Sequence, residues 1–221
     1  MAAKGLFWST LTEPLIRQNP VMLQILGICS ALAVTTSLDT AITMSASLTA
    51  VLVLSAMFVS LIRRHIPDSI RLIVQIIIVA SLVIVIDQFL QAYFFDISKR
   101  LSVYVGLITT NCIVLGRTES FSRSNPSLRS MVDALGNGLG YSMVLIFVGA
   151  TRELFGNGSL LGFPVIPTID QGGWYTPLAL MLLAPSAFFI LGGLVWFVRS
   201  INTYQIEAPE HQPVEKKESR A

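Results

Sequence analysis

The chain has 221 residues, of which 53% are hydrophobic and 13% are charged, and its formal net charge is +2. Soluble domains carry about 25% charged residues, so this composition excludes an ordinary soluble domain and indicates a membrane protein. The chain contains no basic patch interleaved with aromatic residues, so no nucleic-acid partner is expected.

The two ends of the chain are polar. Residues 1–20 include Glu13, Pro14 and Arg17 and lack an apolar core followed by a small-residue cleavage site. We therefore expect a cytoplasmic N-terminal segment rather than a signal peptide. Residues 201–221 are polar and contain proline, which predicts a disordered cytoplasmic tail that carries no chemistry.

Between these ends lie six apolar segments that we predict to cross the membrane as helices, which makes the fold all-α. A helix rises about 1.5 Å per residue, so roughly 20 apolar residues cross about 30 Å of hydrocarbon. Proline, asparagine and serine in the short loops mark where one helix stops and the next begins. The predicted segments are Val21–Thr36, Ala41–Ile62, Leu72–Phe94, Leu101–Gly116, Met131–Leu154 and Pro177–Val198.

The basic residues predict the orientation of these helices. All 15 lysines and arginines except Lys99, Arg100 and Arg152 fall on the side that holds both termini and the second and fourth loops. Because basic residues accumulate on the cytoplasmic side of a membrane protein, we predict that both termini are cytoplasmic.

The first and fourth segments are short, and each carries one of the two cysteines, Cys29 and Cys112. Each is about 16 residues long, or about 24 Å as a straight helix. The stretches LGICSALAVTT and GLITTNCIVLG surround the thiols with glycine, serine, threonine or asparagine. Such residues allow a membrane helix to break or to pack closely, so we interpret both segments as interrupted helices.

Each short segment also begins a set of three crossings. Three is an odd number, so the second set, residues 97–200, is inserted upside down relative to the first set, residues 21–96. The pattern predicts an inverted repeat. Interrupted segments at matching places in two such halves indicate a functional site at the membrane midplane.

The cysteines have two interpretations. One is that they are small apolar fillers, as most buried cysteines are. The other is that pseudo-symmetry brings the two thiols together to bind a metal; a disulfide between them is disfavoured inside the bundle. A tetrahedral or iron-sulfur site needs four ligands. The two histidines are not expected to complete it, because His65 lies in a loop and His211 in the tail. A metal site would therefore need two more cysteines from another subunit.

Six stretches, in order between about Asn19 and Arg199, together resemble a known family. They are LGICSALAVTT, SLIRRHIPDSIRLIVQ, ASLVIVIDQFLQAYFFDISKRLSVYVGLITTNCIVLGR, DALGNGLGY, RELFGNGSL and LMLLAPSAFF. The chain is similar to the D-subunit family of the bacterial sodium-translocating NADH:quinone oxidoreductase (Nqr), which extends to membrane subunits of the related Rnf complexes.

The resemblance implies a translocase subunit of a sodium-pumping NADH:ubiquinone reductase in the bacterial inner membrane, not catalytic alone. It implies a six-helix inverted repeat that pairs with a homologous E subunit of opposite topology and assembles with subunits A, B, C and F. The two chains would hold an intramembrane 2Fe-2S cluster, with Cys29 and Cys112 as two of its ligands, that relays electrons between cytoplasmic and periplasmic cofactor subunits. FAD, FMN and other flavins would belong to other subunits only.

Four polar residues flank the cysteines in the sequence. Ser30, Thr109, Thr110 and Asn111 either donate hydrogen bonds to the cluster sulfur atoms or hold the helices together. The sequence leaves both roles open.

Two intramembrane acids are candidates for a cation path. Asp87 ends the run SLVIVID, and Asp133 opens the fifth segment in MVDALGNGLGY. A carboxylate at such depth is costly and is a functional candidate by default. Equally, Asp133 at a helix start would stabilise the helix dipole, and water would reach an interfacial Asp87. The GNGLG motif follows no strand, so it predicts a packing or hinge surface rather than a dinucleotide site.

Other functions stay open. The chain is alternatively a subunit of an Rnf-type ferredoxin:NAD oxidoreductase, a small inverted-repeat transporter that binds a solute at its broken segments, or an assembly subunit with inert thiols. No Ser-His-Asp, HExxH or Walker pattern occurs in the sequence, so no hydrolytic or NADH-binding site is expected in this chain alone.

Overall fold

The computed structural model describes residues 10–11, 19–63, 66–67, 70–93, 106–122, 124–161, 163–164, 176 and 178–201. These residues are mostly helical and include one short hairpin, in which β1 (Ser159–Leu160) pairs antiparallel with β2 (Phe163–Pro164). The helices are α2 (Ile28–Val34), α3 (Leu38–Ile62), α4 (Arg71–Tyr93), α6 (Cys112–Arg117), the π-helix η1 (Thr118–Ser122), α7 (Ser127–Asn157), α8 (Ala179–Leu182) and α9 (Ala184–Ile201).

Four of the described helices, α3, α4, α7 and α9, are long and apolar enough to cross a membrane. They coincide with the second, third, fifth and sixth segments that the sequence predicts. The predicted N-terminal segment and tail lie almost entirely outside the described residues. The boundary between the two repeats, near residue 97, lies outside them as well.

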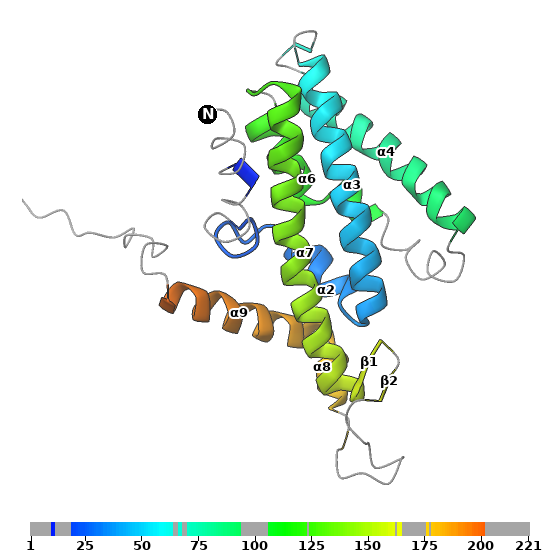
Figure 1. Cartoon of the computed structure of the whole chain (residues 1–221), viewed down its shortest axis with the longest axis vertical. Coiled ribbons are helices and arrows are strands. Elements are labelled where there is room, and N and C mark those ends of the chain that lie inside the picture. Colours follow the sequence, from blue (N-terminus) through cyan, green and yellow to red (C-terminus); the bar gives the residue numbers. More distant parts are fainter. Residues whose placement is uncertain are drawn as a thin grey trace, which may run out of the picture.

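The centre of the molecule is an antiparallel pair formed by α3 and α7 (Figure 1). At one end of the pair the Leu38 backbone N–H donates to Oε2 of Glu153 at 2.7 Å. At the other end the Ser60 hydroxyl donates to the carbonyl of Asn125, two residues before α7, at 2.8 Å. These contacts hold the two helices in register over the full length of α3.

The glycine-rich turn of α7, residues 136–140, is a packing surface, as the sequence predicts. A Cβ at Gly138 would lie 2.7 Å from the side chain of Thr49 on α3. The Gly140 carbonyl accepts a hydrogen bond from Nδ2 of Asn19 at 3.1 Å. The missing side chains therefore let α3 and the segment before α2 approach the α7 backbone.

The helices α4 and α9 diverge from this central pair on different sides (Figure 1). Only 17% of the apolar window of each helix is buried within the chain. Large apolar side chains point outward along both, including Ile77 and Ile84 on α4 and Phe189 and Trp196 on α9. These faces need lipid or another protein chain as a neighbour, because water would leave them unfavourably solvated.

The first predicted segment, Val21–Thr36, is not a continuous helix. Turns precede α2, Ile25 has φ of 56°, and Gly27 adopts the left-handed conformation with φ of 83°. Seven residues then form the helix that carries Cys29. The interruption that the sequence predicts is present, and a glycine allows it because that backbone conformation is strained for other residues.

The fourth predicted segment, Leu101–Gly116, is interrupted as well. Residues 106–109 are helical, the chain turns at Thr110 and Asn111, and α6 begins at Cys112. The Asn111 side chain accepts a hydrogen bond from the Ile113 N–H at 3.0 Å and so caps the new helix. Residues 101–105 of this segment lie outside the described residues.

The π-helix η1 continues α6 and connects it to α4. Glu119 of η1 forms an ion pair with Arg71 at 2.9 Å and accepts a hydrogen bond from Nε2 of Gln75 at 2.8 Å. Both partners lie in the first turns of α4. The end of the fourth segment is therefore attached to the third segment by charged and polar side chains.

The prediction that Pro177–Val198 forms one helix is wrong. Leu183 is extended, with φ of −76° and ψ of 151°, and separates α8 from α9. Pro185 has no N–H to donate to the carbonyl of Met181 four residues earlier, so an α-helical bond is lost there. The Met181 carbonyl instead accepts from the Ser186 hydroxyl at 2.6 Å.

The fifth predicted segment also begins too late. The helix α7 starts at Ser127, after Pro126, whose carbonyl accepts from the Ser130 N–H at 3.1 Å. Asp133 consequently lies in the second turn and is 4% exposed, so the expectation that it opens the helix and stabilises its dipole is wrong.

Arg152 lies inside α7, within the fifth predicted segment, and is 0% exposed. Its guanidinium donates to the carbonyls of Met181, Leu182 and Leu183 at 3.1, 2.8 and 3.1 Å, at the break between α8 and α9. It also donates to the Leu32 carbonyl at 3.3 Å and to Oγ1 of Thr35 at 2.7 Å. Arg152 therefore joins the end of α2 to the broken sixth segment.

Candidate functional site

The two cysteines occupy matching places. Cys29 is the second residue of α2 and Cys112 is the first residue of α6, so each lies at the start of a short helix that follows a break. Both are exposed. Exposure disagrees with the interpretation of two buried apolar fillers and leaves the cysteines accessible to whatever covers this face.

The residues next to the cysteines bind each other. Ser30 follows Cys29, and Asn111 precedes Cys112. Nδ2 of Asn111 donates a hydrogen bond to Oγ of Ser30 at 3.0 Å, across 81 residues of sequence. The starts of the two short helices are therefore in direct contact.

A buried tyrosine of α7 completes this contact. Tyr141 is 0% exposed, and its hydroxyl lies 2.6 Å from Oγ of Ser30. Oγ of Ser30 also accepts from Nδ2 of Asn111 and lies 3.0 Å from the Gly27 carbonyl, so one serine hydroxyl contacts all three groups. Tyr141 was not among the site residues predicted from the sequence. A tyrosine within an apolar helix is nevertheless a usable signal, because its buried hydroxyl needs a partner.

Gly27 makes the close approach sterically possible. A Cβ at this position would lie 2.6 Å from Cδ1 of Ile113 and 3.1 Å from Cε2 of Tyr141. The turn before α2 thus packs directly on α6 and α7. The glycine in the sequence LGIC serves both the left-handed turn and this contact.

The cluster lies about halfway along the central helices. Tyr141 is near the midpoint of α7, and the next residue, Ser142, faces Thr49 near the midpoint of α3, with their hydroxyls 3.4 Å apart. Residues at the middle of two spanning helices lie near the centre of the hydrocarbon. The cysteine pair therefore lies deep between the two ends of the bundle.

The polar neighbours of the cysteines differ in their contacts. Ser30 and Asn111 are buried and bind between helices, which supports the helix-contact role. Thr110 is exposed and its hydroxyl reaches only the Gly106 carbonyl, at 3.5 Å, while Thr109 is half-buried. Donation to a cluster sulfur stays a prediction for all four.

The two candidate acids have protein partners. Asp133, which is buried, forms an ion pair with the half-buried Arg117 of α6, in which Nε of Arg117 donates to Oδ2 at 3.1 Å and Nη2 contacts Oδ1. Asp87 on α4 is half-buried and accepts from Nε2 of Gln91 at 2.8 Å. Asp133 thus attaches the end of α6 to α7, and a cation path through either acid stays a prediction.

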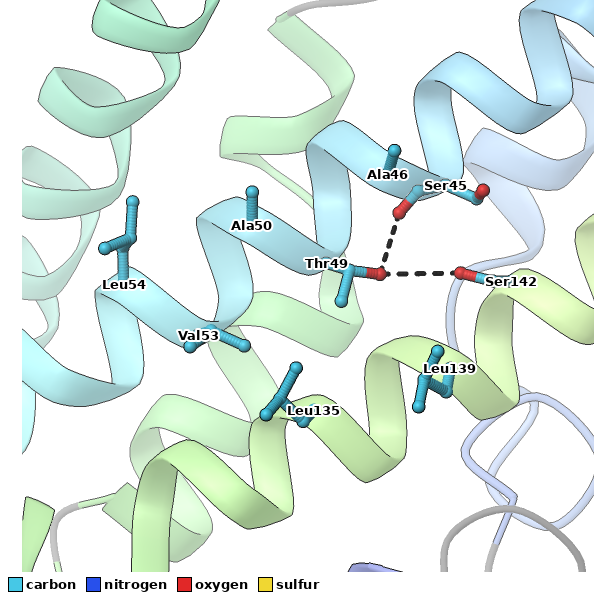
Figure 2. Close-up of a pocket in the computed structure, with 9 residues that line it drawn as sticks. All are labelled: Ser45, Ala46, Thr49, Ala50, Val53, Leu54, Leu135, Leu139 and Ser142. Carbon is cyan, nitrogen blue, oxygen red and sulfur yellow. Dashed lines mark hydrogen bonds between the residues drawn. The ribbon is translucent and has the colours of Figure 1, made fainter. Parts of the chain in front are cut away.

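A hollow of about 650 Å³ lies between α3 and α7 (Figure 2). Among the described residues, its polar lining comes from the hydroxyls of Ser45, Thr49 and Ser142, beside alanine, valine and leucine. These three hydroxyls donate to carbonyls within their own helices, at 2.7 to 2.8 Å. The hollow is apolar and contains neither cysteine, so it does not resemble a binding site for a polar solute.

The cysteine pair does not complete a metal site from this chain alone. Within the described residues, no group of three or more histidine, cysteine, aspartate or glutamate side chains is placed to hold a metal ion. Two thiols are half of the four ligands that tetrahedral and iron-sulfur sites need.

The chain is similar to a group of known proteins. Residues 7–195 match the family model described as "Rnf-Nqr subunit, membrane protein". The protein of Shewanella frigidimarina is 58% identical over 198 residues, 90% of this chain and 94% of its own length, and that of Serratia proteamaculans is 58% identical over 197 residues, 89% and 94%. The protein of Psychromonas ingrahamii is 56% identical over 210 residues, 95% and 100%.

All three relatives carry the name of the D subunit of Na(+)-translocating NADH-quinone reductase. Their identity and coverage confirm the resemblance seen in the sequence. The chain therefore belongs to the Rnf-Nqr subunit family of membrane proteins.

Proposed function

We propose that the chain is a membrane subunit of a sodium-translocating NADH:quinone reductase. In this proposal Cys29 and Cys112 supply two of the four ligands of a 2Fe-2S cluster, and a homologous partner subunit supplies the others. The names of the relatives support the complex. An Rnf-type complex is the alternative within the same family.

The observation that carries the cluster proposal is the hydrogen bond from Asn111 to Ser30. It joins the residues adjacent to the two cysteines at 3.0 Å, while both cysteines remain exposed. Thiolates are the usual ligands of iron-sulfur clusters, so the donor set fits. The two missing ligands are expected from the chain that covers the exposed face.

The chain's own part in the reaction is structural. A bound 2Fe-2S cluster supplies one-electron transfer at a potential set by hydrogen bonds and burial. This chain contributes two thiolates at mid-depth, holds them on short helices and keeps water away with the partner subunit. Electrons would then pass between cofactor subunits on the cytoplasmic and periplasmic sides, with the flavins held in those subunits.

The same proposal includes a six-helix inverted repeat. Each half begins with a broken cysteine-bearing segment, continues in a long central helix and ends in a diverging helix: α2, α3 and α4 in the first half, and α6, α7 and α8–α9 in the second. The antiparallel packing of α3 and α7 supports this symmetry. With Arg152 removed from the charge count, the excess of basic residues still favours cytoplasmic termini in a bacterial inner membrane.

Electron paramagnetic resonance of the purified complex tests the cluster. We expect Cys29→Ala and Cys112→Ala each to remove one rhombic iron-sulfur signal while other signals of the complex persist. Ser142→Ala is the matched control, because the Ser142 hydroxyl donates to the Gly138 carbonyl within α7 and faces Thr49 on α3.

The possible outcomes separate the alternatives. Retention of every signal in both cysteine variants, with quinone reduction intact, would leave an assembly subunit with inert thiols. A solute transporter would tolerate both substitutions and bind its solute without the other subunits. Reduction of NAD by ferredoxin, instead of quinone by NADH, would assign the chain to an Rnf complex.

A further inference from the structure

We propose that the Tyr141 hydroxyl is a positioning group that fixes the separation of Cys29 and Cys112 by holding Ser30, to which Asn111 is hydrogen-bonded. The separation itself follows from the hydrogen bonds of this chain. Its importance for a bound cluster rests on the proposed function.

Three polar groups surround the Ser30 hydroxyl. Nδ2 of Asn111 donates to Oγ of Ser30 at 3.0 Å. The Gly27 carbonyl lies 3.0 Å from the same oxygen and can only accept from it. The Tyr141 hydroxyl lies 2.6 Å from Oγ of Ser30, and either hydroxyl can donate in this pair.

The two short helices cannot hold these positions alone. α2 has 7 residues and α6 has 6, and isolated helices of that length are unstable. Both are attached to α7 at their far ends. Arg152 of α7 binds the Leu32 carbonyl and Thr35 at the end of α2, and Asp133 of α7 pairs with Arg117 at the end of α6.

Those attachments leave the cysteine-bearing starts to be fixed separately. Tyr141 lies between Asp133 and Arg152 on the same helix, at the level where the two starts meet. Asn111 and Ser30 hold the starts to each other, and Tyr141 holds the pair to α7. Without the hydroxyl, the two starts remain linked but lose this polar contact with the central helix.

The separation can be measured without a cluster. The sequence contains only two cysteines, and both are exposed, so nitroxide labels attach to Cys29 and Cys112 of the full chain without removing other thiols. Electron–electron double resonance in lipid nanodiscs then gives the distance distribution between the labels. We expect one narrow distribution in the unmodified chain and a broader or shifted one in Tyr141→Phe.

Two further variants make the test specific. Ser142→Ala is the matched control: it removes a hydroxyl from the next residue of α7, which donates to Gly138 and faces α3. We expect its distribution to equal that of the unmodified chain. Ser30→Ala removes the hydrogen-bond partner of the Tyr141 hydroxyl. We expect it to broaden the distribution as Tyr141→Phe does, which keeps the test valid if one variant fails to fold.

The assembled complex supplies the second measurement. Removal of a group that orients metal ligands typically weakens metal binding about 10- to 100-fold. We expect Tyr141→Phe to lose iron to a chelator faster than Ser142→Ala by a factor in that range, and to shift the iron-sulfur resonance.

The outcomes distinguish this inference from the proposed function. Unchanged label distances in both Tyr141→Phe and Ser30→Ala would overturn the positioning role, whatever the complex contains. Broadened distances in a complex that lacks a cysteine-dependent iron signal would uphold the positioning role and remove the cluster proposal.

Discussion

Replacement of Arg152 by glutamine is expected to destabilise the protein strongly. The guanidinium is 0% exposed and makes five hydrogen bonds, four to backbone carbonyls and one to the Thr35 hydroxyl. Glutamine has two N–H donors on one nitrogen, so at least three of the five bonds are lost. Hydrogen bonds in membrane proteins average about 0.6 kcal/mol, which gives about 2 kcal/mol for three.

The carbonyls that lose Arg152 are not equally affected. The Met181 and Leu183 carbonyls also accept from the Ser186 hydroxyl at 2.6 and 2.8 Å, so they keep a partner. The Leu182 carbonyl is bound by Arg152 at 2.8 Å, and a buried group left without a partner costs about 1–3 kcal/mol. The total loss in free energy of unfolding is therefore about 3–5 kcal/mol.

Unfolding of the full chain in mixed detergent micelles, followed by circular dichroism, measures this loss. Arg129→Gln is the matched control, because Arg129 lies on the same helix and is exposed; it should change the free energy of unfolding by less than about 0.5 kcal/mol. Arg152→Lys, with three donors, should fall between the two. Equal stabilities of Arg152→Gln and Arg129→Gln would refute the assignment of Arg152 as the connection between α2 and the break in the sixth segment.

Three further substitutions follow from close contacts. Gly27→Ala should destabilise the chain by about 1–3 kcal/mol, because the added methyl meets Ile113 and the left-handed turn is lost; an accompanying Ile113→Val should recover part of the thermal midpoint. Asp133→Asn should cost about 1–3 kcal/mol, because the half-buried Arg117 loses its charge partner. A double variant with Arg117→Gln should cost less than the sum of the single variants in denaturant titrations. Gly138→Ala should lower the thermal midpoint by crowding α3, and no change there would contradict the observed contact.

The sequence predicted the long helices because their signal is local. A charge-free apolar run longer than the hydrocarbon thickness indicates a spanning helix without knowledge of its neighbours, and α3 and α4 agree with the predicted segments to within a few residues. The interruptions before Cys29 and Cys112 were also predicted, since glycine, threonine and asparagine indicated them. Their residue-level form depends on Gly27 and on the Asn111 cap, which only the structure displays.

The failures of prediction have a common physical cause, which is that tertiary partners decide the outcome. Pro185 alone does not settle whether a membrane helix breaks, because neighbouring groups must bind the freed carbonyls. Those groups are Ser186 nearby and Arg152, about thirty residues away in sequence. For the same reason the sequence did not reveal the roles of Arg152 and Tyr141, because their partners lie on other segments.

The π-helix η1 makes the contact between the fourth segment and α4 sensitive to a deletion. A π-turn contains about one residue more than an α-turn, and one residue of helix corresponds to a rotation of about 100°. Deleting Thr118 would return this stretch to α-helical spacing and leave Cys112 upstream unmoved, but it would turn Glu119 away from Arg71 and Gln75. A change of length in η1 therefore alters how the fourth segment is attached to α4 without moving the thiol.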